Sequence, residues 1–406
     1  MPQTLGMRDT STYGAGGTLE RKYDVSDKVF LLDPGTNPLL TLLTNIGKVS
    51  DGVSWKGSSM KKKVTIDPQF KEFEDAYGTA KTTITSGLTT ETTWPVADAS
   101  IFAEGDVLLI VDSATKAMEQ VFVQTVTVPT TIVVVRAQGT AQVNPLTNGS
   151  YVYRIGSAND EGATYRSSNT TRKTLQSNYT QIFRTPFALT NTEASTEMYT
   201  GDELKYQTTK KGIEHALDIE RAFWFGNQAE VTGLTGQVKR YTGGIFERIN
   251  ELGAAYIQDE SGSTLTESEF ITFLKKAFAH GRSNKYLFCS GTVLQAINNF
   301  SAGALRITPK DTTYGVQLST YLSPWGTVNL VYNPLFTQDF DGYATMIDFD
   351  TISYRFLGGN GKNRDTKLYM NRQNPGVDGV INEYITECGL ERQGFERNAY
   401  LKGVTG

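Results

Sequence analysis

A β-rich segment set between two polar, basic stretches is the feature that most constrains how this chain can fold. From Thr82 to Ile155 the sequence is rich in Thr and Val and contains about six strand-length runs, such as VLLIV and TTIVVV. Gly, Pro, Asn-Gly and Asp-Ser separate these runs at the spacing that is typical of a small β-barrel or β-sandwich. The pattern therefore predicts a compact all-β domain over residues 81–155.

The stretches on either side of this segment predict a two-stranded arm. YTQIFRTPFALT alternates apolar and polar residues as a half-exposed strand does, and VSWKGSSMKKKVTI does so more loosely. We expect residues 50–80 and 156–188 to form an extended loop that carries the β domain at its tip. Such an arm reaches toward neighbouring molecules, so it favours assembly over catalysis.

Length and charge limit the classes of function. With 406 residues, the chain can hold two or three domains with cores of their own. Its 39 Lys and Arg residues are outnumbered by 43 Asp and Glu residues, so tight nucleic-acid binding, which needs a concentrated basic face, is not expected. No apolar run reaches about 18 residues and no signal sequence stands out, so we expect folding in the cytoplasm and no membrane partner. Cys289 and Cys388 lie in apolar runs and are expected to be buried, reduced thiols.

Residues 190–226 contain the clearest helical pattern. Thr190 and Glu193 have the spacing of a capping box, and Gly201-Asp202 predicts a break at which a second helix begins. From Asp202 to Phe225 this helix would extend about 36 Å at 1.5 Å per residue, and Gly226 would end it. We expect a polar spine with one narrow apolar stripe, formed by Ile213, Ala216, Leu217, Glu220 and Trp224.

The remaining sequence mixes strands and helices without a regular repeat. GGIFERI, KYLFCS and several runs from Val316 onward predict strands, whereas GTVLQAINNF and TESEFITFLKKAFAHG, the latter capped by Thr266 and Glu269, predict helices. GGNGK, at 358–362, is expected to form a hairpin tip, because it lacks the spacing and the hydroxyl residue of a phosphate loop. The predicted fold class is therefore α+β.

Residues with catalytic or metal-binding chemistry are sparse. Of the two histidines, His280 is expected to cap a helix end, and His215 to lie on the surface or between helices. No nucleophile, base and orienting group form a recognisable motif, so we expect no enzyme, no cofactor and no metal site. Most charged residues of the β segment are acidic, which predicts a solvent-facing module: Glu91, Asp98, Glu104, Asp106, Asp112 and Glu119. A Ca²⁺ site is the alternative there, although no EF-hand loop is present.

Charged residues of the predicted arm are the candidates for contacts between subunits. The basic ones are Lys61, Lys62, Lys63, Arg166, Arg172, Lys173 and Arg184, and the acidic ones are Glu72, Glu74 and Asp75. They either form a solvated face or pair with oppositely charged groups of a neighbouring subunit. Pairs of the second kind would set register more than they add affinity.

The order of these segments resembles that of the Hong Kong 97-type major capsid proteins of tailed phages, in particular those with a β insertion in the extended loop. The resemblance rests on ADASIFAEGDVLLI, on the exit segment RIGSANDEGATYRSSNTTRKTLQSNYTQIFRTPFALTNT, on EHALDIERAFWFG and on the terminal NEYITECGLERQGFERNAYLKGV. It implies an N-terminal arm at 1–49, the extended loop with its inserted domain, and a peripheral domain made of 189–235 and 331–406. An axial α/β domain would occupy 236–330.

The resemblance also implies a function and partners. It implies a structural protein that assembles with itself as hexamers and pentamers into the icosahedral or elongated head of a virion, inside the host bacterial cytoplasm. The head would enclose double-stranded DNA without sequence-specific binding. A portal at one vertex, a decoration protein and a separate scaffolding protein are the further implied partners. The last of these is expected because some relatives carry a long, cleaved scaffolding segment where this chain has only a short arm.

Two alternative functions remain open from the sequence. The first is a β-rich phage surface protein that binds carbohydrate through its β domain. The second is the shell protein of a bacterial nanocompartment, which shares the fold. A stable monomer that binds a glycan would support the first alternative, whereas particles would support assembly.

Overall fold

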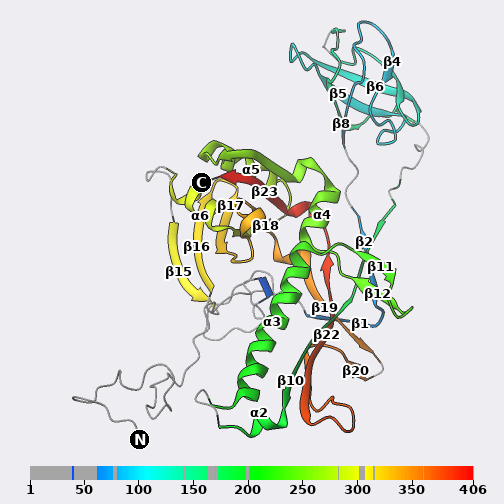
Figure 1. The fold of residues 1–406 in the computed structure, drawn as a ribbon. Helices are drawn as coiled ribbons and strands as arrows, with labels where there is room; N and C mark the ends of the chain where they lie inside the picture. The colour runs from blue at the N-terminus through cyan, green and yellow to red at the C-terminus, as the bar shows by residue number, and fades with distance from the viewer. Residues whose placement is uncertain are drawn as a thin grey trace, which may run out of the picture. The chain divides into compact units, whose positions relative to one another are not determined.

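The computed structural model describes residues 39–40, 62–75, 80–139, 143–162, 170, 172–197, 201–281, 283–300, 307–313, 316–359 and 361–405 (Figure 1). These residues divide into two compact units. One unit is Phe73–Gln176, and the other combines the described residues up to Glu72 with those from Ser177 onward. Apart from Leu39 and Leu40, the predicted N-terminal arm at 1–49 lies outside the described residues.

The unit Phe73–Gln176 is built around a small antiparallel barrel. Its strands are β3 (Lys81–Thr83), β4 (Thr93–Pro95), β5 (Asp106–Val111), β6 (Met118–Thr127), β7 (Thr131–Val135) and β8 (Tyr151–Ser157), in the order β3-β8-β5-β6-β7-β4. A bridge between Ile84 and Val96 joins the two outer strands, so the sheet closes on itself. The strand prediction for 82–155 is confirmed, and the barrel rather than the sandwich is formed.

Alternating side chains of these strands fill the barrel. Trp94, Leu108, Ile110, Val121 and Val134 are all at most 1% exposed and belong to one apolar cluster. The indole Nε1 of Trp94 donates to the carbonyl of Glu91 at 2.8 Å, so even the largest core side chain has its polar atom satisfied. The unit therefore has a core of its own.

Three of the six acidic residues that were expected to face solvent are buried inside this barrel unit. Asp106, Asp112 and Glu119 are at most 1% exposed. Asp112 accepts hydrogen bonds from the backbone amides of Thr115 and Thr147, both at 2.7 Å, and these bonds hold the pKa of its carboxyl well below the usual range. The expectation that acidity meant exposure was wrong at these positions, because turn amides and basic side chains satisfy the carboxylates.

The second unit contains a mixed sheet in the order β1-β19-β22-β10. Its strands are β1 (Lys63–Thr65), β10 (Gln181–Thr190), β19 (Ile352–Gly359) and β22 (Gly379–Arg392), with β20 (Lys362–Asn363) and β21 (Lys367–Tyr369) attached to β19 and β22. The β19–β20 pairing confirms the predicted hairpin at GGNGK. A separate two-stranded ladder pairs β2 (Gln69–Glu74) with β9 (Thr174–Tyr179). The two runs on which the arm was predicted do not pair with each other: Lys63–Thr65 pairs with β19 and Gln181–Thr190 pairs with β22, because both runs are covered by the strands of the larger sheet.

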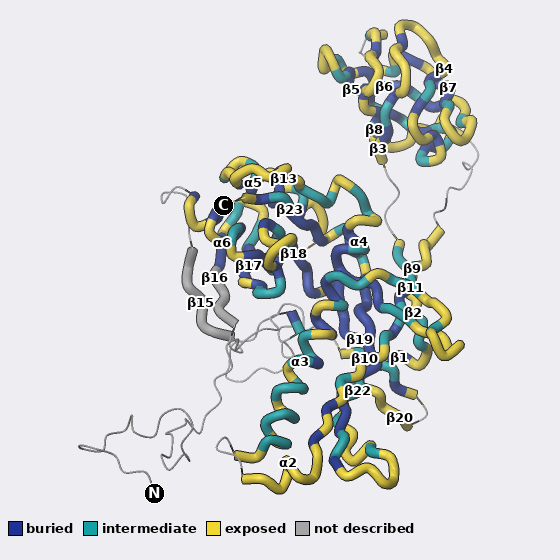
Figure 2. Tube along the Cα trace, in the orientation of Figure 1, coloured by how far each residue is buried: buried dark blue, intermediate teal, exposed yellow. Residues whose placement is uncertain are grey.

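A long helix, α3 (Glu203–Phe225), packs on this sheet after the short helix α2 (Asn191–Ser195) (Figure 1). Asp202 caps α3, as predicted, by accepting a hydrogen bond from the amide of Lys205 at 3.2 Å. Gly226 ends the helix in an extended conformation, not in the left-handed one. The C-terminal half of α3 is the more deeply buried half (Figure 2).

The predicted stripe of α3 is only partly correct. The buried residues are His215, Ile219, Glu220, Phe223 and Trp224, so the buried face is rotated relative to the expected one. Ile213 is 40% exposed, and the stripe follows the spacing of 215, 219 and 223 instead. His215, which was expected at the surface or between helices, lies 1% exposed against the sheet.

A seven-stranded sheet forms the rest of this unit, in the order β13-β23-β18-β14-β17-β16-β15. Its strands are β13 (Ile257–Thr264), β14 (Asn284–Cys289), β15 (Ile307–Thr313), β16 (Val316–Ser323), β17 (Gly326–Tyr332), β18 (Ala344–Ile347) and β23 (Ala399–Thr405). The helices are α4 (Ile245–Leu252), α5 (Glu267–Ala277) and α6 (Gly291–Asn298), and β11 (Ala229–Thr232) pairs with β12 (Val238–Tyr241) as a hairpin. The mixed order of strands and helices agrees with the predicted α+β class.

Local signals account for most of these elements, with one exception. The predicted capping box of Thr266 and Glu269 begins α5, and Cys289 and Cys388 are buried free thiols, as expected. The GGIFERI segment was predicted to be a strand, but it begins helix α4. Ile245, Phe246 and Ile249 are buried at helical spacing, and this packing outweighs the weak strand preference of so short a segment.

Candidate interaction surfaces

The base of the arm holds a charged cluster that joins β1, β2, β19 and β22. The carboxylate of Glu391 accepts from Lys63 Nζ at 2.8 Å and from both Nε and Nη2 of Arg355, at 3.0 and 2.8 Å. Glu72, on β2, lies 3.6 Å from the same guanidinium. Glu391 is 1% exposed and Glu72 is 7% exposed, so both carboxyl groups are shielded from water.

The two carboxyl groups of this cluster differ in their protonation. Burial, together with the neighbouring carboxylate of Glu391, raises the pKa of Glu72 well above its usual range. Burial acts in the same direction on Glu391, but hydrogen bonds from Arg355, Glu72 and Lys63 outweigh it and leave the pKa of Glu391 below its usual range. At neutral pH Glu72 therefore keeps its proton, while Glu391 carries the charge that pairs with Lys63 and Arg355.

Two more of the predicted basic residues have partners within the chain. Lys62 forms an ion pair with Asp365 and lies over the rings of Tyr354 and Phe356, with its Nζ 5.3 and 5.4 Å from their centroids. Arg184 on β10 forms a bidentate ion pair with Glu383 on β22, in which Nε and Nη2 donate to the two carboxylate oxygens at 2.5 and 2.8 Å. Lys62, Lys63, Glu72 and Arg184 thus contribute to the fold of one subunit.

The other predicted contact residues lie farther along the arm or outside the described residues. Asp75, Arg172 and Lys173 are exposed, and Glu74 is half-buried at the end of β2. Lys61 and Arg166 lie outside the described residues. Whether any of these side chains contacts another subunit stays a prediction.

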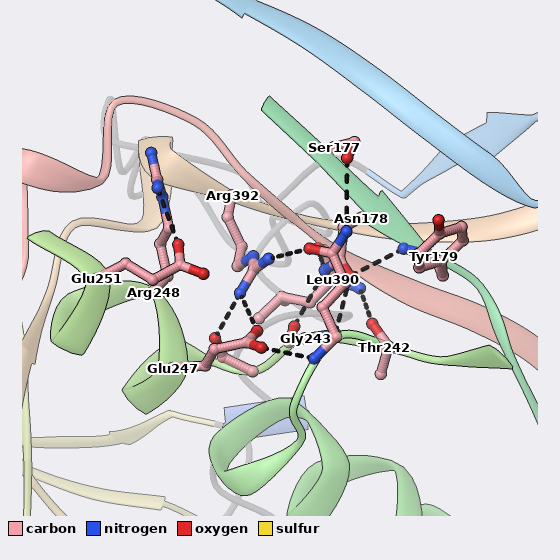
Figure 3. Close-up of polar contacts among 12 residues, drawn as sticks. Ser177, Asn178, Tyr179, Thr242, Gly243, Glu247, Arg248, Glu251, Leu390 and Arg392 are labelled. Atoms are coloured by element: carbon pink, nitrogen blue, oxygen red, sulfur yellow. Dashed lines mark hydrogen bonds and ion pairs between the residues drawn. The ribbon is translucent and has the colours of Figure 1, made fainter. Parts of the chain in front are cut away.

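A buried polar junction that the sequence did not reveal connects β9 with the end of α3, α4 and β22 (Figure 3). The side chain of Asn178 donates to the carbonyls of Gly243 and Leu390, at 3.0 and 2.7 Å, and accepts from the amide of Gly243 at 2.8 Å. Asn178 is 2% exposed, and Leu390 donates its own amide to the hydroxyl of Thr242 at 3.2 Å. The side chain of Asn178 therefore fixes β9 to the main chain of Gly243 and Leu390.

Arg392 completes this junction. Its guanidinium points toward Glu247, whose carboxylate lies 2.8 Å away, and it also donates to the carbonyl of Gly244 and the side chain of Gln228, at 3.0 and 2.9 Å (Figure 3). Glu247 in turn accepts from the amide of Gln228 at 2.6 Å. Because Arg392 is 145 residues from Glu247 in the sequence, no local pattern could have predicted the pair.

Glu220 holds the short described piece of the N-terminal region. It is fully buried in α3, and its two carboxylate oxygens accept from the backbone amides of Leu39 and Leu40, at 3.0 and 3.2 Å. Burial raises the pKa of this carboxyl to about 7, although the two amide hydrogen bonds oppose the shift. Leu39 is also fully buried, so this segment is part of the core.

Apolar side chains project into solvent from the strands of the arm. Val64, Ile66, Phe73 and Leu175 are 53%, 86%, 74% and 50% exposed. They come from β1, β2, β9 and the turn between β1 and β2. Each is a large apolar side chain that a single subunit leaves in water, so each is a candidate for burial against another subunit.

Among the described residues, no group of three or more His, Cys, Asp or Glu side chains is placed to bind a metal ion. The described helices include none that is long and apolar enough to cross a membrane. A groove of about 480 Å³ at the end of α3 is lined mainly by apolar residues, with Arg221 as its one ionisable lining group. These features offer no arrangement of acid, base and nucleophile.

Comparison with known proteins decides the family. A family model described as the SU10 major capsid protein matches residues 8–405 of the chain. The chain belongs to this family of major capsid proteins. Membership places it among structural capsid proteins and not among enzymes.

Individual relatives of this capsid protein are distant. The major capsid protein of Pseudomonas phage PaMx41 is 22% identical over 251 residues, and the match covers 59% of each chain, so our chain spans less than two thirds of that relative. A chain from the capsid of a native GTA particle is 8% identical, covers 98% of this chain and 99% of its own length, and has a TM-score of 0.50. A chain from Microbacterium phage Oxtober96 is 8% identical, with 94% and 96% covered and a TM-score of 0.47. The match to the GTA capsid chain supports a capsid fold of mixed α and β content.

Proposed function

We propose that this protein builds the head shell of a phage virion by assembling with copies of itself as hexamers and pentamers. The observation that carries the proposal is the exposure of four large apolar side chains within the proposed extended loop: Val64, Ile66, Phe73 and Leu175. A monomer would leave these side chains in water, whereas a shell can bury them between subunits. Membership of a major capsid protein family favours this function over a carbohydrate-binding one.

The parts of the fold have distinct roles in this proposal. Residues 50–80 and 156–188 form the extended loop of a Hong Kong 97-type subunit, and 81–155 form an all-β domain inserted into it. The peripheral domain combines 189–235, which includes α3, with part of 331–406, and 236–330 form the axial domain. The boundary predicted at 330/331 needs correction, because β18 and β23 pair within the seven-stranded sheet of 236–330. The N-terminal arm, 1–49, is anchored on α3 through the contacts of Leu39 and Leu40 with Glu220.

Exposed charges near the outer end of the arm are the proposed polar contacts between subunits. Asp75, Arg172 and Lys173 are exposed there, next to Glu74. Lys61 and Arg166, which lie outside the described residues, are the remaining candidates. Lys62, Lys63 and Arg184 play a smaller part, because acidic partners in the same chain already satisfy them. Glu72 also plays a smaller part, because it is buried and keeps its proton at neutral pH. Exposed single pairs contribute about 0–1 kcal/mol, so these charges select register and the apolar side chains supply affinity.

Other components of the head follow from the same proposal. The shell encloses double-stranded DNA without sequence-specific binding, which agrees with a formal net charge of −4. A separate scaffolding protein, a portal at one vertex and a decoration protein are the proposed partners during and after assembly.

The decisive experiment compares particle formation by the parent chain and by arm variants. We expect the parent to form particles in negative-stain electron micrographs, and I66D combined with F73D to abolish them. Because both positions are exposed, the substitutions should leave the melting temperature of the subunit nearly unchanged. The matched control, I66V combined with F73Y, should still assemble. A parent chain that stays monomeric and binds a glycan would overturn the proposal in favour of a carbohydrate-binding protein.

A further inference from the structure

The outer surface of the barrel has an uncharged apolar face centred on β5. Leu108 and Ile110 point into the barrel and are fully buried, so Val107, Leu109 and Val111 point outward. A strand with one solvated face normally alternates apolar and polar residues. In β5 all three outward positions are aliphatic, as in a strand that is covered on both faces.

Neighbouring strands extend this face in three rows. In the paired registers, Tyr151 and Met118 flank Val111, Tyr153 and Gln120 flank Leu109, and Phe122 lies beside Val107. Tyr151 and Met118 are 48% and 59% exposed, and Tyr153, Phe122 and the three β5 residues are half-buried. The "outer β5 face" comprises Val107, Leu109, Val111, Met118, Gln120, Phe122, Tyr151 and Tyr153. Gln120 is its one polar amide, and none of the eight side chains is charged.

The size of this face decides what it can do alone. Three strand spacings of about 4.8 Å and roughly six residues of about 3.3 Å give an area of roughly 300 Å². A stable interface between free proteins buries about 800 Å² on each partner. The outer β5 face is therefore too small to hold two free chains together. It can hold together two barrels that other contacts already keep close, because their high effective concentration removes most of the entropy that two free chains would lose on association.

Charge at the two ends of β5 favours a second copy of the same face as the occupant. Exposed Glu104 lies just before the strand, and exposed Lys116 lies in the turn just after it. A twofold axis near Leu109 would place the acidic end of one strand against the basic end of its partner. The apolar middle of the face would meet itself, which an uncharged surface tolerates and a charged one does not.

We propose that the outer β5 face packs against the outer β5 face of a second copy of this chain, with the two β5 strands antiparallel about a twofold axis near Leu109. The inference rests on the proposed shell function, since the shell holds the two barrels within reach of each other. It adds a contact between barrels to those made by the arm.

Cysteine cross-linking in particles of the full chain tests this pairing. Both natural cysteines are fully buried, so an introduced thiol reacts without background. Facing sheets lie about 10 Å apart, too far for a direct disulfide, so a short bismaleimide is the suitable reagent. We expect L109C to give a cross-linked dimer in particles but not in the unassembled chain. S86C, exposed beside the β3–β4 seam across the barrel, should give none.

A second set of variants tests whether the two β5 strands are antiparallel and distinguishes the possible ways in which the proposal can fail. Particles that contain both E104C and K116C chains should give a dimer, whereas particles of either variant alone should not. Adding L109K to the E104C and K116C chains should abolish this dimer, and adding L109M should preserve it. If the parent forms no particles, the shell function itself fails. If particles form but L109C links to a different protein, links within its own chain or does not link, the shell function stands and the barrel pairing is overturned.

Discussion

At the scale of single residues, the cluster at the arm base makes opposite predictions for its two carboxyl groups. Glu72 keeps its proton near neutral pH, so E72Q replaces one neutral group by another and should change the unfolding free energy by less than about 1 kcal/mol. E391Q removes the charge that pairs with Lys63 and Arg355, so it should cost about 3–5 kcal/mol. Urea unfolding of the unassembled chain at pH 7, followed by circular dichroism, measures both. Equal losses in the two variants would show that Glu72 is ionised.

Glu220 predicts a pH dependence with a definite sign. Its pKa in the folded chain, about 7, is above the value of 4.5 for the free side chain. The folded state therefore binds the proton more tightly, and the resulting stability is complete below pH 4.5, declines as the pH rises and is lost above about pH 7. The parent should gain up to about 3 kcal/mol more than E220Q between pH 8 and pH 5.

The comparison with E220Q isolates this residue, because every other titrating group is shared by the two chains. E220A provides a second control, since it removes both acceptors of the Leu39 and Leu40 amides. It should be less stable at every pH and have the same slope as E220Q. Parallel curves for the parent and both variants would mean that Glu220 does not titrate in this range.

At the scale of secondary-structure elements, His215 fixes α3 against β10 and β22. Its ring nitrogens lie 2.8 Å from the hydroxyl of Thr185 and 2.7 Å from that of Thr386, and its ring stacks on Tyr384. H215A should cost about 2–4 kcal/mol of unfolding free energy, because it leaves a cavity and removes a hydrogen-bond partner from the hydroxyls of Thr185 and Thr386. H280A, at an exposed position, is the matched control and should change the free energy by at most about 0.5 kcal/mol.

The pH dependence of His215 has the opposite sign to that of Glu220. Burial lowers the pKa of His215 below its ordinary value of 6.5, so the folded state favours the neutral ring. This stability is present above pH 6.5 and is lost as the pH falls through the folded pKa. H215A should remove that part of the acid sensitivity, and thermal melts at pH 7 and pH 5 can measure it. An unchanged acid sensitivity in H215A would contradict the assignment.

At the scale of the whole molecule, the sequence predicted what local patterns determine. The capped starts of α3 and α5, the strands of the barrel and the buried thiols all depend on residues a few positions apart. The buried polar sites depend on partners that are distant in the chain: 181 residues separate Leu39 from Glu220, and 328 separate Lys63 from Glu391. A sequence pattern shows a charged side chain there, but only the tertiary fold shows that it is buried and paired. The same limit explains why the acidic barrel residues were expected in solvent.

The largest rearrangement that the structure predicts to be tolerated is removal of the barrel. Its apolar core is formed within 84–152, and its first and last strands pair, with Lys81 opposite Tyr153 and the amide of Arg154 bonded to the carbonyl of Ala80 at 2.7 Å. Because the ends leave side by side, a short Gly/Ser linker can replace residues 81–155 without stretching either arm strand.

The excised chain should keep both cores of the other unit, which contain Cys388 and Cys289. Both thiols are fully buried, so in the folded product they should stay unreactive toward a thiol reagent until denaturant is added. The helical circular dichroism signal should also be retained, since the described helices all lie outside 81–155. Loss of that signal, or rapid labelling of either cysteine in buffer, would show that the barrel is needed for the rest of the chain to fold.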